Sequence, residues 1–166
     1  MLQYYATLLH ATWLGRAMAG GVPWLWPTFE IAHLIGMAFL LGCVGAIDLR
    51  LLGIAKGVPL ASLSPLRSVS VIGFTMTLIT GLGFFAGDPT QYLNNISVFG
   101  AKLLFVALAA ANSLLFYSSG MAKSVWPMRS HESAPGGAKA FAAASLALWI
   151  GVMFWGRMLS IAGGAF

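Results

Sequence analysis

The sequence predicts an all-α integral membrane protein, a bundle of four transmembrane helices preceded by an amphipathic helix at the membrane surface. Of the 166 residues, 59% are hydrophobic and only 8% are charged, whereas about a quarter of the residues in a soluble domain are charged. A soluble fold of this size would expose much apolar surface and aggregate. The apolar residues are also gathered in four long segments, which is what a membrane requires.

Each of the four segments is long enough to cross the hydrocarbon core, which needs about 20 mostly apolar residues per helix. We expect the spans at residues 29–53, 68–86, 98–118 and 138–162. The stretches between them contain the glycine, proline and polar residues that interrupt helices. Residues 28–166 are therefore expected to form one membrane domain.

Residues 1–27 differ from the rest of the chain. The run LQYYATLLHATWLGRAM places apolar residues on one helical face, and the following GGVPWLWP is rich in Trp and Pro. Amphipathic helices lie in the membrane interface, where tryptophan is enriched. We expect an interfacial helix followed by a Trp/Pro turn, with a fifth span as the alternative.

Basic residues predict the orientation in the membrane. Most of them lie in or beside the first and third loops: Arg50, Lys56, Arg67, Lys123, Arg129 and Lys139. The second loop has Asp88 and no basic residue before Lys102. Because excess Lys and Arg marks the cytoplasmic side, we expect a bacterial inner-membrane protein with loops one and three cytoplasmic and both termini periplasmic. The net charge of +5 then reflects orientation, and nucleic acid is not an expected partner.

Four ionisable side chains are expected at similar depth near the periplasmic side, although each costs a few kcal/mol or more inside a span. Glu30 and His33 are three residues apart and so share a helix face. Lys102 opens the third span, and Arg157 lies about a turn and a half from the end of the fourth. We predict that they form a site for a cofactor, ion or small molecule. The alternative is a buried ion-pair network that only fixes helix packing.

Among cofactors, a b-type haem suits these residues best, because haem needs an axial ligand, an aromatic slot and cations for its propionates. His33 is the expected metal ligand, Glu30 would orient its imidazole, and Lys102 and Arg157 would hold the propionates. The expected slot is formed by glycines and aromatic residues: Gly36, Gly81, Gly83, Phe84, Phe85, Trp149, Phe154 and Trp155. Zinc suits the site less well, because the chain has only four acidic residues.

The second axial ligand is less clearly indicated. The candidates are His10, Met37, Met153 and Met158. Each is better explained as an ordinary interface or core residue, and without any of them the iron would be five-coordinate.

Other polar residues in the spans have structural interpretations. Asp48 and Arg50 are expected to form an interfacial ion pair near Arg67. Asn112 is expected to hydrogen-bond across helices, and Cys43 to be a buried, inert thiol. Small residues at spacing four predict close helix packing, within the bundle or between copies. They are Ala38, Gly42 and Ala46; Gly73, Thr77 and Gly81; and Ala143, Ala147 and Gly151.

Motifs along nearly the whole chain resemble a bacterial membrane family known only as a domain of unknown function. They are W-P-x-x-E-x-x-H and D-L-R-L-L-G in the first span, TGLGFF in the second, FGAK and AAAN in the third and SLALWIGVMFWGR in the fourth. The chain is more loosely similar to small haem-associated membrane proteins, the membrane protoporphyrinogen oxidases and copper-resistance D-like proteins, which pair an early-span His with a later-span Lys. His33 and Lys102 match that pair. The further polar residues of the oxidases are not evident, so the resemblance implies haem more than enzymatic activity.

We therefore expect a protein that binds a b-type haem for electron transfer or porphyrin handling. One alternative is a non-catalytic subunit that packs into an oligomer or anchors a partner complex, and another is a proton or ion pathway through the same four residues. The expected partners are the lipid bilayer and either further copies of the chain or a redox partner. The sequence shows no nucleotide motif and no nucleophile–base pair, so an enzyme acting alone is not expected.

Overall fold

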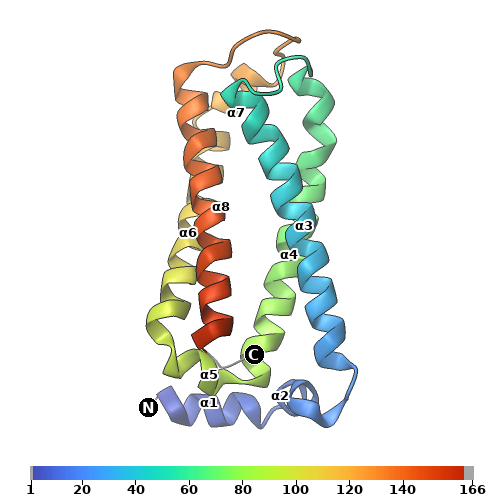
Figure 1. Cartoon of the computed structure of the whole chain (residues 1–166), viewed down its shortest axis with the longest axis vertical. Helices are drawn as coiled ribbons and strands as arrows, with labels where there is room; N and C mark the ends of the chain where they lie inside the picture. Colours follow the sequence, from blue (N-terminus) through green and yellow to red (C-terminus); the bar gives the residue numbers. More distant parts are fainter. Residues whose placement is uncertain (1, 163–166) are drawn as a thin grey trace.

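Four long helices run side by side along most of the molecule (Figure 1). The computed structural model describes residues 2–162. In this part, the helices long and apolar enough to cross a membrane are α3 (Leu25–Leu52), α4 (Ser64–Gly87), α6 (Ile96–Ser118) and α8 (Gly136–Ala162). No strand occurs among the described residues. The predicted all-α four-helix bundle is confirmed, and its helices fit a multi-pass membrane protein.

Helix α3 begins four residues earlier than expected. The Trp/Pro-rich segment was interpreted as a turn, but the helix begins at Leu25 and Pro27 lies in its first turn. Proline is tolerated there because the first backbone N–H groups of a helix have no intrahelical acceptor. The helix ends as expected at Gly53, whose left-handed backbone (φ 97°) lets its N–H reach the Leu49 and Arg50 carbonyls at 3.1 and 3.2 Å.

The other three spans are also slightly longer than expected at their N-terminal ends. A short 3₁₀ helix, Leu60–Leu63, leads into α4, and Pro65 occupies the first turn of that helix. The same tolerance of proline in a first turn explains why α4 begins at Ser64 instead of residue 68. Helices α6 and α8 begin two residues before their expected positions, at Ile96 and Gly136.

The N-terminal segment lies across one end of the bundle, beside α5 (Pro89–Asn94) (Figure 1). It is broken into α1 (Leu2–His10), α2 (Trp13–Arg16) and a π-helical turn, Ala17–Gly21. The break occurs because the Thr12 hydroxyl caps α2, accepting from the Gly15 N–H at 3.1 Å. The prediction of a single helix was thus wrong. With nine residues α1 is too short to be a fifth span.

The long helices associate as two close pairs. Helix α3 packs against α4, and α6 packs against α8, while α3 also meets α8 (Figure 1). Glycine allows the α3–α4 approach, because a Cβ at Gly73 would lie 2.6 Å from the carbonyl oxygen of Gly36. On the other pair, the Phe105 ring occupies the space above Gly151. Two of the three predicted small-residue stripes therefore serve packing inside the chain.

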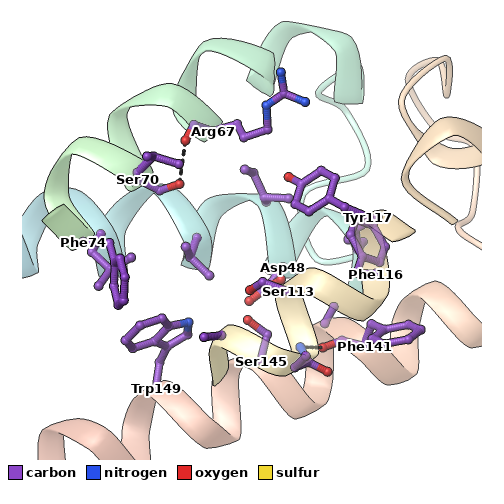
Figure 2. A pocket seen from close by; sticks show the side chains of 18 residues that line it. Asp48, Arg67, Ser70, Phe74, Ser113, Phe116, Tyr117, Phe141, Ser145 and Trp149 are labelled. Carbon is purple, nitrogen blue, oxygen red and sulfur yellow. Dashed lines mark hydrogen bonds between the residues drawn. The ribbon is translucent and has the colours of Figure 1, made fainter. Parts of the chain in front are cut away.

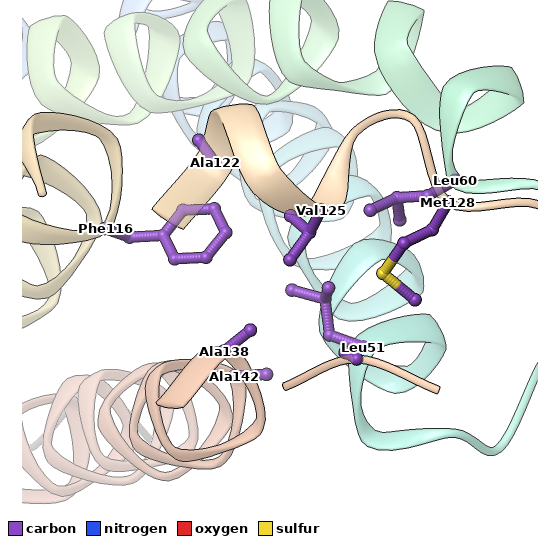
Figure 3. Close-up of a cluster of buried hydrophobic side chains, with 9 residues drawn as sticks. Leu51, Leu60, Phe116, Ala122, Val125, Met128, Ala138 and Ala142 are labelled. Atoms are coloured by element: carbon purple, nitrogen blue, oxygen red, sulfur yellow. The ribbon is translucent and has the colours of Figure 1, made fainter. Parts of the chain in front are cut away.

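The first and third loops close the opposite end of the bundle together with α7 (Met121–Val125). The Arg50 side chain is fully buried there and donates to the carbonyls of Val58, Arg129 and Glu132. A buried apolar cluster joins both loops to the helix ends (Figure 3): Leu51, Leu60, Phe116, Ala122, Val125, Met128, Ala134, Ala138 and Ala142. Loops one and three thus lie at one end, called here the α7 end. The short helices α1 and α5 lie at the other, the α1/α5 end.

The outer faces of the long helices are apolar. Leu78, Leu82, Leu114 and Ile150 are each at least half exposed. Such a surface is unfavourable in water but is covered by lipid in a bilayer.

Candidate functional site

The predicted cofactor site lies at the α1/α5 end of the bundle. His33 on α3 and Lys102 on α6 are half-buried. Glu30 on α3, Arg157 on α8 and His10 at the end of α1 are exposed. The five residues lie in the elements that meet at this end, but they differ in whether they face the interior.

The His33 ring is held by α4. Its Nδ1 atom lies 2.7 Å from Oγ1 of Thr80, and that hydroxyl donates its single proton to the carbonyl of Met76 at 2.7 Å. Thr80 therefore accepts from His33, so the proton of the neutral imidazole is on Nδ1. The lone pair of Nε2 is consequently available to an external ligand.

Aromatic rings surround this imidazole on one side. Phe84 meets the His33 ring edge-on with centroids 5.5 Å apart. Trp26 and Phe29 in turn contact Phe84, at 5.0 and 6.5 Å. On α4, Gly81 borders the same ring, and a Cβ at this glycine would lie 3.8 Å from Cε1 of His33, an ordinary contact distance.

Lys102 approaches the same region from the other helix pair. Its charge interacts with His33, and its side chain passes over Gly156 of α8, where a Cβ would lie 3.7 Å from Cε and 3.8 Å from Nζ. The lysine stem thus lies against Gly156 at an ordinary contact distance. Of the four residues predicted to lie at one depth, His33 and Lys102 therefore interact electrostatically across the two helix pairs.

Two of the predicted roles need correction. Glu30 was expected to orient the imidazole, but the Nδ1 atom is bonded to Thr80 and the Glu30 side chain is exposed. Spacing of three residues puts Glu30 and His33 on neighbouring positions of one helix, yet His33 turns toward α4. His10 was a candidate second ligand, and its side chain is exposed at the end of α1. Thr80 was not predicted to take part, because a threonine in a span commonly bonds its own helix.

The predicted aromatic slot is only partly assembled around His33. Phe84 is in place, but Phe85 stacks on Phe99 with ring centroids 5.6 Å apart and planes inclined by 8°. Phe154 and Trp155 pair with each other at 5.4 Å. Trp149 contacts Phe74 at 6.4 Å and belongs to a different region of the bundle.

The glycines of the predicted slot are likewise divided in their contacts. A Cβ at Gly36 would meet Met76 and Gly73 of α4, and Gly83 is covered by the Phe29 ring. Gly81 is the one of the three that borders the imidazole.

The expected ion pair of Asp48 and Arg50 is not formed. Residues two apart on a helix point to different faces. Arg50 faces the loop carbonyls, whereas Asp48 interacts with the Ser145 side chain on α8. Two other predictions are confirmed: Asn112 donates from Nδ2 to the Phe141 carbonyl of α8 at 3.1 Å, and the Cys43 thiol is buried.

Comparison with protein-family models, curated proteins and solved structures finds no significant match for the chain. What the site can do is therefore judged from its own side chains.

Proposed function

We propose that the protein binds a b-type haem at the α1/α5 end through Nε2 of His33, for electron transfer or porphyrin handling. The observation that carries this proposal is the orientation of the imidazole. Its Nδ1–H is committed to Thr80, which leaves the Nε2 lone pair for a metal. Metal-ligating histidines commonly donate their other ring N–H to a nearby acceptor in this way. The similarity of the His33–Lys102 pair to small haem-associated membrane proteins supports the same cofactor.

The side chains around His33 fit the remaining needs of a haem. Lys102 supplies a positive charge within electrostatic range of the imidazole, which suits a propionate. Arg157, exposed on α8 at the same end, is the second candidate for this role. Phe84 provides an aromatic wall, and Gly81 borders the ring. A bound haem supplies one-electron chemistry, while the chain supplies the ligand, the charge and an environment poor in water.

The distribution of basic residues supports a position for this site toward the periplasmic side of a bacterial inner membrane. The α7 end holds Lys56, Lys123, Arg129 and Lys139, which favours a cytoplasmic position for that end. A redox partner, or another copy of the chain, would therefore meet the haem at the periplasmic end.

Haemin titration of the detergent-solubilised protein tests the ligand. We expect the wild-type chain to develop a Soret band that saturates near one haem per chain. His33→Ala should weaken binding by more than about tenfold, because the metal ligand is lost. His131→Asn is the matched control, since it removes an imidazole from the third loop and keeps a residue that tolerates the local φ of 66°. A wild-type chain that stays colourless, or a His33→Ala chain that binds as tightly, would refute the proposal.

The role of Lys102 is tested separately with a modified porphyrin. Lys102→Gln should weaken the binding of haemin but leave that of haemin dimethyl ester unchanged, because the ester has no propionate charge. An equal loss with both porphyrins would show that Lys102 acts through packing and not through the propionates.

A further inference from the structure

A cavity of about 290 Å³ lies between the four long helices in the half of the bundle toward the α7 end (Figure 2). None of His33, Thr80, Phe84 and Lys102 lines it, so it is separate from the proposed haem site. Its walls combine apolar side chains with a carboxyl group, an indole N–H and several hydroxyls. The lining includes Asp48 of α3, Arg67, Val71 and Phe74 of α4, Tyr117 of α6 and Trp149 of α8.

Two polar atoms of the lining are buried without a partner. Asp48 is 6% exposed and its Oδ2 atom has no hydrogen-bond partner, although the side chain interacts with Ser145. Trp149 is 8% exposed and its Nε1–H likewise has no acceptor. Figure 2 shows both side chains directed into the cavity from opposite walls. Burial of an unpartnered polar group is costly, and more so within a bilayer, where no bulk water reaches it.

No basic side chain of the described chain is engaged with Asp48. Arg50, two residues away, faces the carbonyls of the loops. Arg67 lines the cavity but lies over the Tyr117 ring, 5.9 Å from its centroid. A buried carboxylate is tolerated when a cation is paired with it. The missing complement in this cavity is therefore a positively charged hydrogen-bond donor.

The cavity lining reaches the outer surface of the bundle at α4 and α6. Arg67 and Val71 on α4 and Tyr117 on α6 line it and are exposed on the outer surface. Aromatic rings form much of the interior, with Phe74 and Trp149 in edge-on contact at 6.4 Å. Such rings favour both an apolar body and a nearby cation. The volume is at the lower end of the range for small-molecule pockets.

We propose that this cavity binds a small hydrophobic amine in its protonated form, taken up from the bilayer. The ammonium N–H donates to Oδ2 of Asp48, and the apolar body lies against Phe74 and Trp149. If the ligand molecule also carries an oxygen atom, that atom can accept a hydrogen bond from Nε1–H of Trp149. This proposal does not depend on haem binding, because the two sites share no residue.

Calorimetric titration with 4-phenylbutylamine tests the proposal on the full chain in detergent. Asp48→Asn keeps the size of the side chain and removes its charge. It should weaken binding by roughly 10- to 100-fold, the usual cost of losing a charged hydrogen bond. The neutral 4-phenylbutan-1-ol should bind the wild type and Asp48→Asn equally, which controls for partition into the micelle. Asp88→Asn, a carboxylate outside the cavity whose capping role asparagine also fills, should bind the amine as the wild type does.

A second variant guards against a change in folding. Ser113→Phe fills part of the cavity and leaves Asp48 in place, so it should also lose amine binding. Equal amine binding by the wild type, Asp48→Asn and Ser113→Phe would overturn the proposal and leave the cavity as a site for water. Asp48→Asn should bind haem as the wild type does. The haem titration of this variant therefore distinguishes a failure of the amine proposal from a failure of the haem proposal.

Discussion

The imidazole of His33 is oriented by a hydroxyl group on the neighbouring helix. Thr80 is buried, and its oxygen lies between the His33 ring and the carbonyl of Met76. A threonine is a modest partner compared with a carboxylate, but it needs no counter-charge within the membrane. The exposed Glu30 is therefore not needed to fix the ring.

Thr80→Val removes this acceptor and keeps the shape of the side chain. We expect haem affinity to fall by roughly 10- to 100-fold, as it does when the partner of a ligating histidine is lost. Thr80→Ser should retain most of the affinity because it keeps the hydroxyl. Haemin titrations of the three chains measure the effect, and equal affinity of Thr80→Val and wild type would show that the hydroxyl has no orienting role.

Tyr92 in α5 gives a pH-dependent prediction outside the spans. Burial, and secondarily the negative charge of Asp88, raise the pKa of Tyr92 from 10.0 to about 12. A raised pKa in the folded state means that the neutral phenol stabilises the fold below pH 10, and that this contribution is lost as the pH rises toward 12. Thermal melts between pH 9 and 12 should show a steeper loss of stability for the wild type than for Tyr92→Phe. Parallel curves for the two chains would contradict this prediction.

The sequence predicts which ionisable residues lie at similar depth in the membrane, but not the direction in which each side chain points. His33 and Lys102 were among four residues predicted to meet because each is costly within a span, and the charge of Lys102 does act on His33. Thr80 was missed because a threonine in a span has a small cost and commonly bonds its own helix, as it does here with Met76. Asp48 was misread as the partner of Arg50, although their spacing of two residues argues against contact.

Helix α3 and helix α4 form the pair on which the proposed haem ligand depends. Their backbones approach closely at Gly36 and Gly73, and His33 and Thr80 lie on the same pair toward the α1/α5 end. The distance between these helices therefore sets the hydrogen bond that orients the imidazole.

Gly73→Ala tests this connection. A Cβ at this position would lie 2.6 Å from both the Gly36 carbonyl oxygen and the Leu40 backbone nitrogen, so the helices must separate. We expect a loss of about 1–3 kcal/mol in the free energy of unfolding, together with weaker haem binding. Gly42→Ala is the matched control, because its Cβ would meet nothing within 4 Å. Denaturant titration in mixed micelles measures the free energy of unfolding of the two variants. Equal stability of Gly73→Ala and Gly42→Ala would count against the close approach of α3 and α4.

The spans themselves were predictable because the membrane imposes length and apolarity on each helix. The errors occurred at the N-terminal ends of the elements, where proline was taken as a break but occupies a first helical turn, as at Pro27 and Pro65. The division of the N-terminal segment was not predicted either, because it depends on the Thr12 cap. The third small-residue stripe remains without a partner inside the described chain at Gly42.

On the scale of the whole molecule, the bundle holds two polar regions at different ends within an apolar exterior. The α1/α5 end presents the imidazole of His33 near the charge of Lys102, and the half toward the α7 end encloses a carboxyl group whose Oδ2 atom has no hydrogen-bond partner. Loops one and three stabilise the α7 end through Arg50 and the apolar cluster. The α1/α5 end is packed largely through ring contacts, such as those of Trp26 with Phe84 and of Phe85 with Phe99.

Chemical rescue of His33→Gly tests the central claim of direct ligation most directly. The visible spectrum of this variant with haemin is recorded with and without added imidazole. If Nε2 of His33 ligates the iron, imidazole that enters the space left by the side chain should restore the wild-type Soret position in the variant. The wild type should show that position without added imidazole. A wild-type spectrum from His33→Gly without imidazole, or no response to imidazole at saturating haemin, would contradict ligation by His33.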